Sequence, residues 1–147
     1  MKICIDTMVL IDILKDENRP FQETFYSAFS SREALVIPVV VFAELMPQFG
    51  GDHKLAALFL KDHQIQVESL DQEGAVLAGQ RWIQYLKKKR KIKCPKCGTP
   101  LSPKEHFLSV FYIGGFALAK CDAILTRDRG IYKKYFPELK GYGGCLR

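Results

Sequence analysis

The sequence lacks the features that mark several protein classes. It does not open on a basic stretch followed by a small-residue cleavage site, and its longest uncharged run, residues 106–119, is shorter than the roughly 20 apolar residues that cross a bilayer. No internal repeat or low-complexity segment is visible, and 48% apolar with 26% charged residues is ordinary for a globular protein. We therefore expect one cytoplasmic domain over residues 1–147, without a membrane segment.

Cysteines are odd in number, and acidic residues are fewer than basic ones. The five cysteines are an odd number, so a disulfide framework is not expected in a chain without a secretory signal. Sixteen Asp and Glu against 22 Lys and Arg leave a net charge of +6, and residues 87–93 read KKKRKIK. This surplus suits an anionic partner such as nucleic acid, although many ordinary basic proteins share it.

Apolar periodicity predicts strands and helices in alternation. The strands are predicted at residues 3–5, 34–38, 65–68 and 123–126, and the helices from about residue 7 and at 19–31, 39–46, 52–63, 72–86, 105–120 and 129–136. This order favours an α/β fold with a parallel sheet of four to five strands and helices on both faces. Residues 87–104, with the basic run, two cysteines and three prolines, predict an irregular insertion loop or hairpin.

Acidic residues follow three of the predicted strands. Asp6 ends the strand sequence KICID, Asp128 ends AILTRD, and Glu44 lies on the helix after residues 34–38. In open parallel sheets, functional residues collect at the carboxyl ends of the strands. An Asp before a helix is also a common N-cap, so capping is the alternative role for Asp6 and Asp128.

The segments around these acids occur in a recognisable order. They are IDTMVLID at residues 5–12, the pair Glu44-Leu45, and ILTRDRG at residues 124–130. In order and spacing the chain resembles the PIN-domain ribonucleases from residue 2 to residue 140, and more narrowly the VapC-type toxins of toxin–antitoxin pairs. The resemblance implies a three-layer α/β/α fold with catalytic acids at Asp6, Glu44 and Asp128. It also implies a homodimer, inhibited by a small antitoxin that occupies the acidic groove.

Clustered carboxylates suit the hydrolysis of RNA phosphodiesters. The reaction needs a charged transition state to be neutralised and a water to be made nucleophilic near neutral pH, and Mg²⁺ or Mn²⁺ does both. These ions prefer carboxylate and water oxygens, which Asp6, Glu44 and Asp128 would supply. A small phosphatase using the same acids is an alternative. The candidates for RNA contact are Thr7, Thr126, Arg127, Arg129, Lys87, Lys88, Lys89 and Arg90. The two threonines are equally explained by local bonds to the backbone.

One position departs from the family pattern. The family places a further Asp on the helix before the last strand, and the matching residue here is Val110. Valine cannot bind a metal, so the site would carry about three carboxylates. His106, one helical turn earlier, is a candidate for compensation, whereas Asp122 suits a structural role. Loss of the acid leaves a second interpretation open: a PIN-fold module with impaired catalysis that binds RNA or protein.

The cysteine pair Cys94 and Cys97 has the spacing of half a zinc site. In Cys-Pro-Lys-Cys-Gly, two thiolates can bind one tetrahedral ion. The other ligands would come from His106 and a distant cysteine, or from the same pair on a second copy; free thiols are the alternative. Trp82, upstream of the basic run, is either a core residue or a platform for stacking bases.

Overall fold

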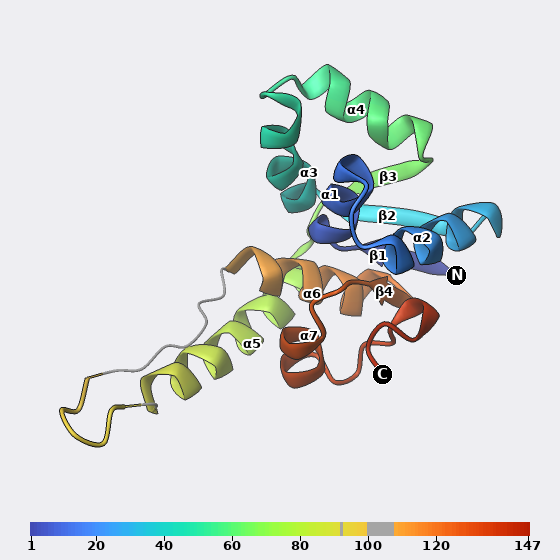
Figure 1. The fold of residues 1–147 in the computed structure, drawn as a ribbon. Coiled ribbons are helices and arrows are strands. Elements are labelled where there is room, and N and C mark those ends of the chain that lie inside the picture. Colours follow the sequence, from blue (N-terminus) through green and yellow to red (C-terminus); the bar gives the residue numbers. More distant parts are fainter. Residues whose placement is uncertain (92, 100–107) are drawn as a thin grey trace.

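A parallel sheet of four strands forms the centre of the molecule (Figure 1). This computed structural model describes residues 1–91, 93–99 and 108–147. The strands are β1 (Lys2–Ile5), β2 (Ala34–Pro38), β3 (Ile65–Glu68) and β4 (Ala123–Leu125), and they lie in the order β3-β2-β1-β4. Each neighbouring pair is parallel. The predicted α/β class and a sheet of four strands are therefore confirmed.

The two central strands and β4 are buried along nearly their whole length. Ile3, Cys4 and Ile5 of β1 are fully buried, as is Ile124 of β4. A parallel sheet covered on both faces requires such continuous apolar runs, which is why KICI and AIL do not alternate with polar residues. The register pairs Ile5 with Leu125, so β1 and β4 end at the same level. The residues that follow these two strands therefore start side by side.

Seven α-helices and two 3₁₀ turns are described around the sheet. The helices are α1 (Thr7–Lys15), α2 (Arg19–Ser30), α3 (Val39–Leu45), α4 (His53–Asp62), α5 (Gln72–Lys91), α6 (Leu108–Lys120) and α7 (Arg129–Tyr135), with turns η1 (Met46–Phe49) and η2 (Tyr142–Gly144). Helix α6 lies against β1, β2 and β4, and α5 packs along α6; α1 contacts α2 and α3. Among the described residues, no helix is long and apolar enough to cross a bilayer.

Helices α5 and α6 approach each other through glycines. A Cβ atom added to Gly115 would lie 2.3 Å from the carbonyl oxygen of Gly74 and 2.9 Å from the backbone nitrogen of Ala78. Next to it, a Cβ at Gly114 would lie 2.4 Å from the ring of Phe136. Only glycine fits these two positions. Close contact with α5 therefore helps to hold α6 against the sheet.

Aromatic side chains fill the space between α5, α6 and α7. Trp82 stacks on Tyr85 at a ring distance of 5.2 Å and meets the edge of Phe111 at 5.1 Å. Phe111 in turn contacts Tyr135 of α7. Trp82 is thus a packing residue, which favours the core interpretation of this tryptophan.

The predicted insertion begins later than the sequence suggested. Residues 87–91 belong to α5, so the expectation of an irregular segment from residue 87 was wrong there. Lys and Arg are good helix formers, and their positive charges suit the carboxyl end of a helix. Residues 93–99 form a turn beyond this end. The predicted helix start at residue 105 and His106 lie outside the described residues.

Candidate active site

The carboxyl edge of the sheet brings the three predicted acids together. Asp6 follows β1, Asp128 lies two residues beyond Thr126 at the end of β4, and Glu44 lies on α3 after β2. These strands are neighbours in the sheet. The negative charges of Glu44 and Asp128 both act on the Asp6 carboxylate. The three acids, distant in sequence, therefore share one edge.

Asp6 is held at the base of this edge by the end of β4. Its backbone nitrogen donates to the carbonyl oxygen of Leu125 at 3.0 Å, and Thr126 Oγ1 donates to Asp6 Oδ2 at 2.6 Å. Thr126 is fully buried, and Asp6 is 6% exposed. Burial raises the pKa of Asp6 from its ordinary 3.8 to about 6, and the charges of Glu44 and Asp128 add to this effect. A bound cation would offset the cost of keeping this buried carboxylate charged.

Threonine hydroxyls also connect the other two acids to the site. Thr7 Oγ1 donates to a carboxylate oxygen of Glu44, and Thr126 Oγ1 accepts from the backbone nitrogen of Asp128 at 3.0 Å. The two threonines thus bond the acids as well as the backbone, which goes beyond the local role left open from the sequence. They orient the acids relative to one another.

Helix capping explains only part of the structural role of Asp6 and Asp128. Asp6 stands at the N-cap of α1, but its side chain makes no capping hydrogen bond. Asp128 Oδ1 accepts from the backbone nitrogen of Ile131 at 3.5 Å, the long limit for such a bond. Structural capping therefore does not explain Asp6, and it explains Asp128 weakly.

The expected fourth carboxylate is missing from α6. Val110 is half-buried and packs against the hydrophobic core. Across residues 1–91, 93–99 and 108–147, no group of three His, Cys, Asp or Glu side chains is arranged closely enough to hold a metal ion. The site instead pairs Asp6 and Glu44 with threonines. Its donors are all oxygen atoms, the type that Mg²⁺ and Mn²⁺ prefer.

A buried hydroxyl within reach of the charges of the acids has no hydrogen-bond partner among the described residues. Tyr132 of α7 is fully buried, and its OH forms no hydrogen bond among those residues. Burial raises its pKa well above the ordinary value, and the charges of Asp6, Asp128 and Glu44 contribute. An unsatisfied buried hydroxyl costs about 1–3 kcal/mol, so a water or a hydrated ion at this edge would have a ready donor. This feature fits a site that holds a hydrated cation.

A buried ion pair beside the site was not predicted. Asp12 of α1 is fully buried; its Oδ1 accepts from the Asn18 amide at 2.8 Å, and its Oδ2 lies 2.9 Å from Arg127 Nε. This nitrogen and oxygen form an ion pair rather than a directed hydrogen bond. A carboxylate on the apolar face formed by Val9 and Ile13 is the sequence signal that could have indicated a cationic partner. The pair anchors the loop that carries Asp128.

Arg127→Ala should lower the free energy of unfolding by about 2–3 kcal/mol, because it leaves the Asp12 carboxylate buried without its cation. The value is at the low end for buried pairs since the Arg127 side chain is one-third exposed. Urea denaturation would measure it. Arg129→Ala, the exposed neighbour, is the matched control and should change stability by less than about 0.5 kcal/mol. Equal stability of the two variants would contradict the anchoring role.

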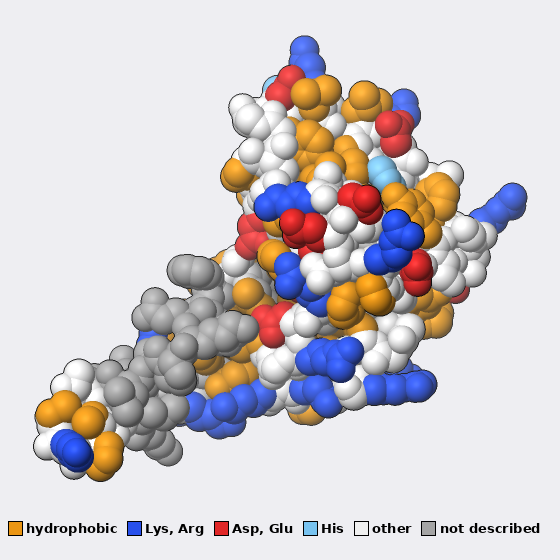
Figure 2. All heavy atoms as spheres, in the orientation of Figure 1, with side chains coloured by type: hydrophobic (Ala, Val, Ile, Leu, Met, Phe, Trp, Pro, Cys, Tyr) orange, Lys and Arg blue, Asp and Glu red, His pale blue; other side chains and the backbone are white. Residues whose placement is uncertain are grey.

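The predicted RNA contacts lie in two places. Thr7, Thr126 and Arg127 belong to the acidic edge, and Arg129 is exposed at the start of α7. On α5, Lys87 and Lys88 are exposed and Lys89 is half-buried, while the side chain of Arg90 is not among those described. Figure 2 shows Lys and Arg side chains in a row from α5 past α7 to the C-terminal segment. Lys88 and Lys134 both lie over the Tyr135 ring.

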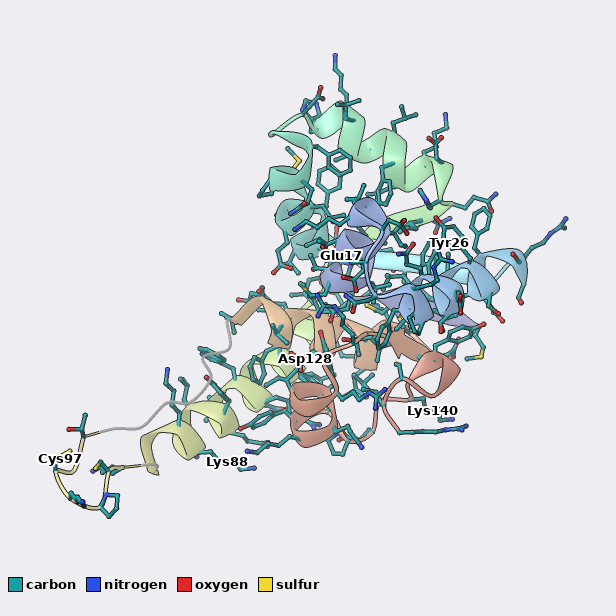
Figure 3. The ribbon with its side chains drawn as sticks, viewed as in Figure 1. Glu17, Tyr26, Lys88, Cys97, Asp128 and Lys140 are labelled. Atoms are coloured by element: carbon teal, nitrogen blue, oxygen red, sulfur yellow. The ribbon has the colours of Figure 1, made fainter. Side chains whose placement is uncertain are left out.

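The cysteine pair is remote from the acids. Figure 3 shows Cys97 at the tip of the segment beyond α5, well separated from Asp128. Cys94 is half-buried, Cys97 is exposed, and both are free thiols. Since no third ligand completes the pair among the described residues, zinc binding stays a prediction.

Comparison with known proteins agrees with this geometry. The family model described as "PIN domain" matches residues 3–89, a segment that includes Asp6 and Glu44. The fold is similar to a chain in the structure of VapBC2 from Rickettsia felis bound to a DNA fragment from their promoter, with a TM-score of 0.64 and 13% identity over 95% of this chain and 96% of that one. It is equally similar to VapBC-1 from nontypeable Haemophilus influenzae, with a TM-score of 0.64 and 21% identity over 96% of both chains. No curated protein sequence matches the chain.

Proposed function

The chain belongs to the PIN-domain family, and on that basis we propose that it is a divalent-metal-dependent endoribonuclease. The observation that carries the proposal is the placement of Asp6, Glu44 and Asp128 at one edge of the sheet, where the charges of Glu44 and Asp128 act on Asp6, with Thr126 bonded to Asp6 and Thr7 to Glu44. Burial, followed by the charges of Glu44 and Asp128, raises the pKa of Asp6, and a cation would stabilise its charged form. Such perturbed groups are typical of functional sites.

The metal in this proposal is Mg²⁺ or Mn²⁺, held by Asp6, Glu44 and Asp128. When bound, such an ion neutralises phosphate charge and lowers the pKa of a water. Thr126 and Thr7 fix the carboxylates that would face the ion, and the buried Tyr132 OH has no hydrogen-bond partner among the described residues. All of these groups supply hard oxygen atoms, in keeping with the preference of both ions.

The basic residues would position the RNA. Lys88 of α5 and Lys134 of α7 both lie over the ring of Tyr135, at 5.2 Å and 5.6 Å from its centroid. Contacts of lysine with phosphate give affinity without reading sequence. Arg127 is already paired with Asp12, so Arg129, which is exposed beside Asp128, is the stronger candidate for contact near the acids.

The proposed biological role is that of a VapC-type toxin. Its support is the fold shared with chains of two VapBC structures, each matched over nearly its whole length. A small antitoxin protein would then bind the chain and cover the acidic edge, and the active form would be a homodimer. Both partners remain part of the proposal.

Val110 favours a second candidate function. With a valine in place of an acid, the edge carries less negative charge, and a second metal ion would bind weakly. A protein with this fold could then bind RNA or protein without cleaving it. The two functions differ in whether a divalent metal produces turnover.

RNA cleavage by the purified chain, free of any partner, tests the proposal. We expect cleavage with Mg²⁺ or Mn²⁺ and none in EDTA, and we expect Val110→Asp to increase the rate by about 10-fold through tighter metal binding. Val110→Asn is the matched control, because it adds a polar group of the same size without the charge. No cleavage by the natural chain, with activity gained only in Val110→Asp, would favour the binding module.

A further inference from the structure

Two thiols lie together in a closed turn beyond the end of α5. The turn is fixed by two backbone hydrogen bonds, from Gly98 nitrogen to the Cys94 carbonyl at 2.9 Å and from Cys94 nitrogen to the Thr99 carbonyl at 2.7 Å. Gly98 has a φ of +70°, which other residues rarely adopt. These features hold Cys94 and Cys97 on one short loop with little freedom to separate.

The thiol of Cys97 faces a hydroxyl within the turn. Cys97 Sγ lies 3.1 Å from Thr99 Oγ1. Thiolate is the form of cysteine that binds metal ions. A Cys-x₂-Cys-Gly turn has the form of one half of a tetrahedral zinc site.

The described body of the same chain offers no further ligand that could complete this zinc site. Cys4 and Cys145 are buried in the core, and Cys121 lies at the end of α6, whereas the turn stands away from the body (Figures 1 and 3). No third ligand stands near the pair within the described ranges. The exposure of Cys97 leaves the open side of the turn accessible to another molecule.

We propose that two copies of the chain share one Zn²⁺, bound by Cys94 and Cys97 of each. Four thiolates with one zinc ion carry a net charge of −2, which needs positive charge nearby. Lys93 and Lys96, exposed on either side of Cys94, supply it from each copy. A second copy is thus the partner that brings both the missing ligands and a compensating charge.

Zinc content tests this inference without reference to cleavage. The full chain, purified under reducing conditions without chelator, should take up about 0.5 zinc per chain, and X-ray absorption should show four sulfur ligands at about 2.3 Å. Cys97→Ser should bind at least fivefold less zinc. Cys121→Ser is the control and should bind as much as the natural chain. Because cleavage is not measured, the result is separate from the fate of the nuclease proposal.

Three results would overturn the shared site. One zinc per chain at saturation would mean that each copy completes its own site. Nitrogen or oxygen among the ligands would mean that another residue replaces the second pair. Less than about 0.1 zinc per chain, unchanged by Cys97→Ser, would mean that the thiols are free.

Discussion

Asp6→Asn is expected to reduce metal-dependent RNA cleavage by at least about 100-fold, because it removes the charge of the most deeply buried acid at the edge. The asparagine oxygen can still accept from Thr126, so the local structure should be kept. Single-turnover cleavage with Mn²⁺ would measure the effect. Glu23→Gln, a change at an exposed acid of α2, is the matched control and should leave cleavage unchanged. A variant that keeps more than a tenth of the rate would place the chemistry elsewhere.

The same substitution should stabilise the metal-free protein at pH 7. The pKa of Asp6 is raised from 3.8 to about 6 by burial, so the folded protein holds this proton more tightly than the unfolded chain. The resulting stability is fully present below pH 4 and is lost as the pH rises to about 6. At pH 7 the buried carboxylate therefore costs about 2–3 kcal/mol, which Asp6→Asn should recover in EDTA. Equal unfolding curves at pH 7 would contradict the raised pKa.

Gly115→Ala is expected to destabilise the fold by about 3 kcal/mol, the upper end of the usual cost of overpacking. The added Cβ would lie 2.3 Å from the Gly74 oxygen and 2.9 Å from the Ala78 nitrogen, and backbone atoms cannot move aside as a side chain can. Helix α6 would have to shift away from α5, and α6 also lies against the sheet. Thermal and urea denaturation would measure the loss.

Gly79→Ala on α5 is the control for this substitution. No atom lies within 4 Å of a Cβ built there, and its backbone is not in the left-handed region. Alanine should therefore raise stability by about 0.5–1 kcal/mol through its higher helix propensity. If both variants lost stability equally, close packing of α5 on α6 would not be the cause.

Much of the fold follows from local patterns in the sequence. The strand ends at Ile5 and Pro38 were predicted because buried parallel strands are short apolar runs bounded by polar or helix-forming residues. The end of α5 was predicted too early, because charge and proline content suggested a loop where lysines continue the helix. The gathering of Asp6, Glu44 and Asp128 followed from the topology of parallel sheets.

Contacts between distant residues could not be predicted in the same way. Arg127 is separated from Asp12 by most of the chain, and nothing local to either residue names the other as its partner. The hydroxyl of Tyr132 comes near the acids only in the folded chain, where α7 packs against α5, and a tyrosine in an ordinary helix pattern does not indicate this position. These positions depend on the assembled core.

The length of α5 has a consequence for how the molecule meets a long substrate. Its 20 residues extend for about 30 Å, and its outer end carries the turn away from the body. Two copies joined at their tips would keep their acidic edges on separate bodies. An RNA long enough to reach both would bind with avidity, since capture at one edge raises the effective concentration at the other. Long RNA should then be held more tightly than short fragments of the same sequence.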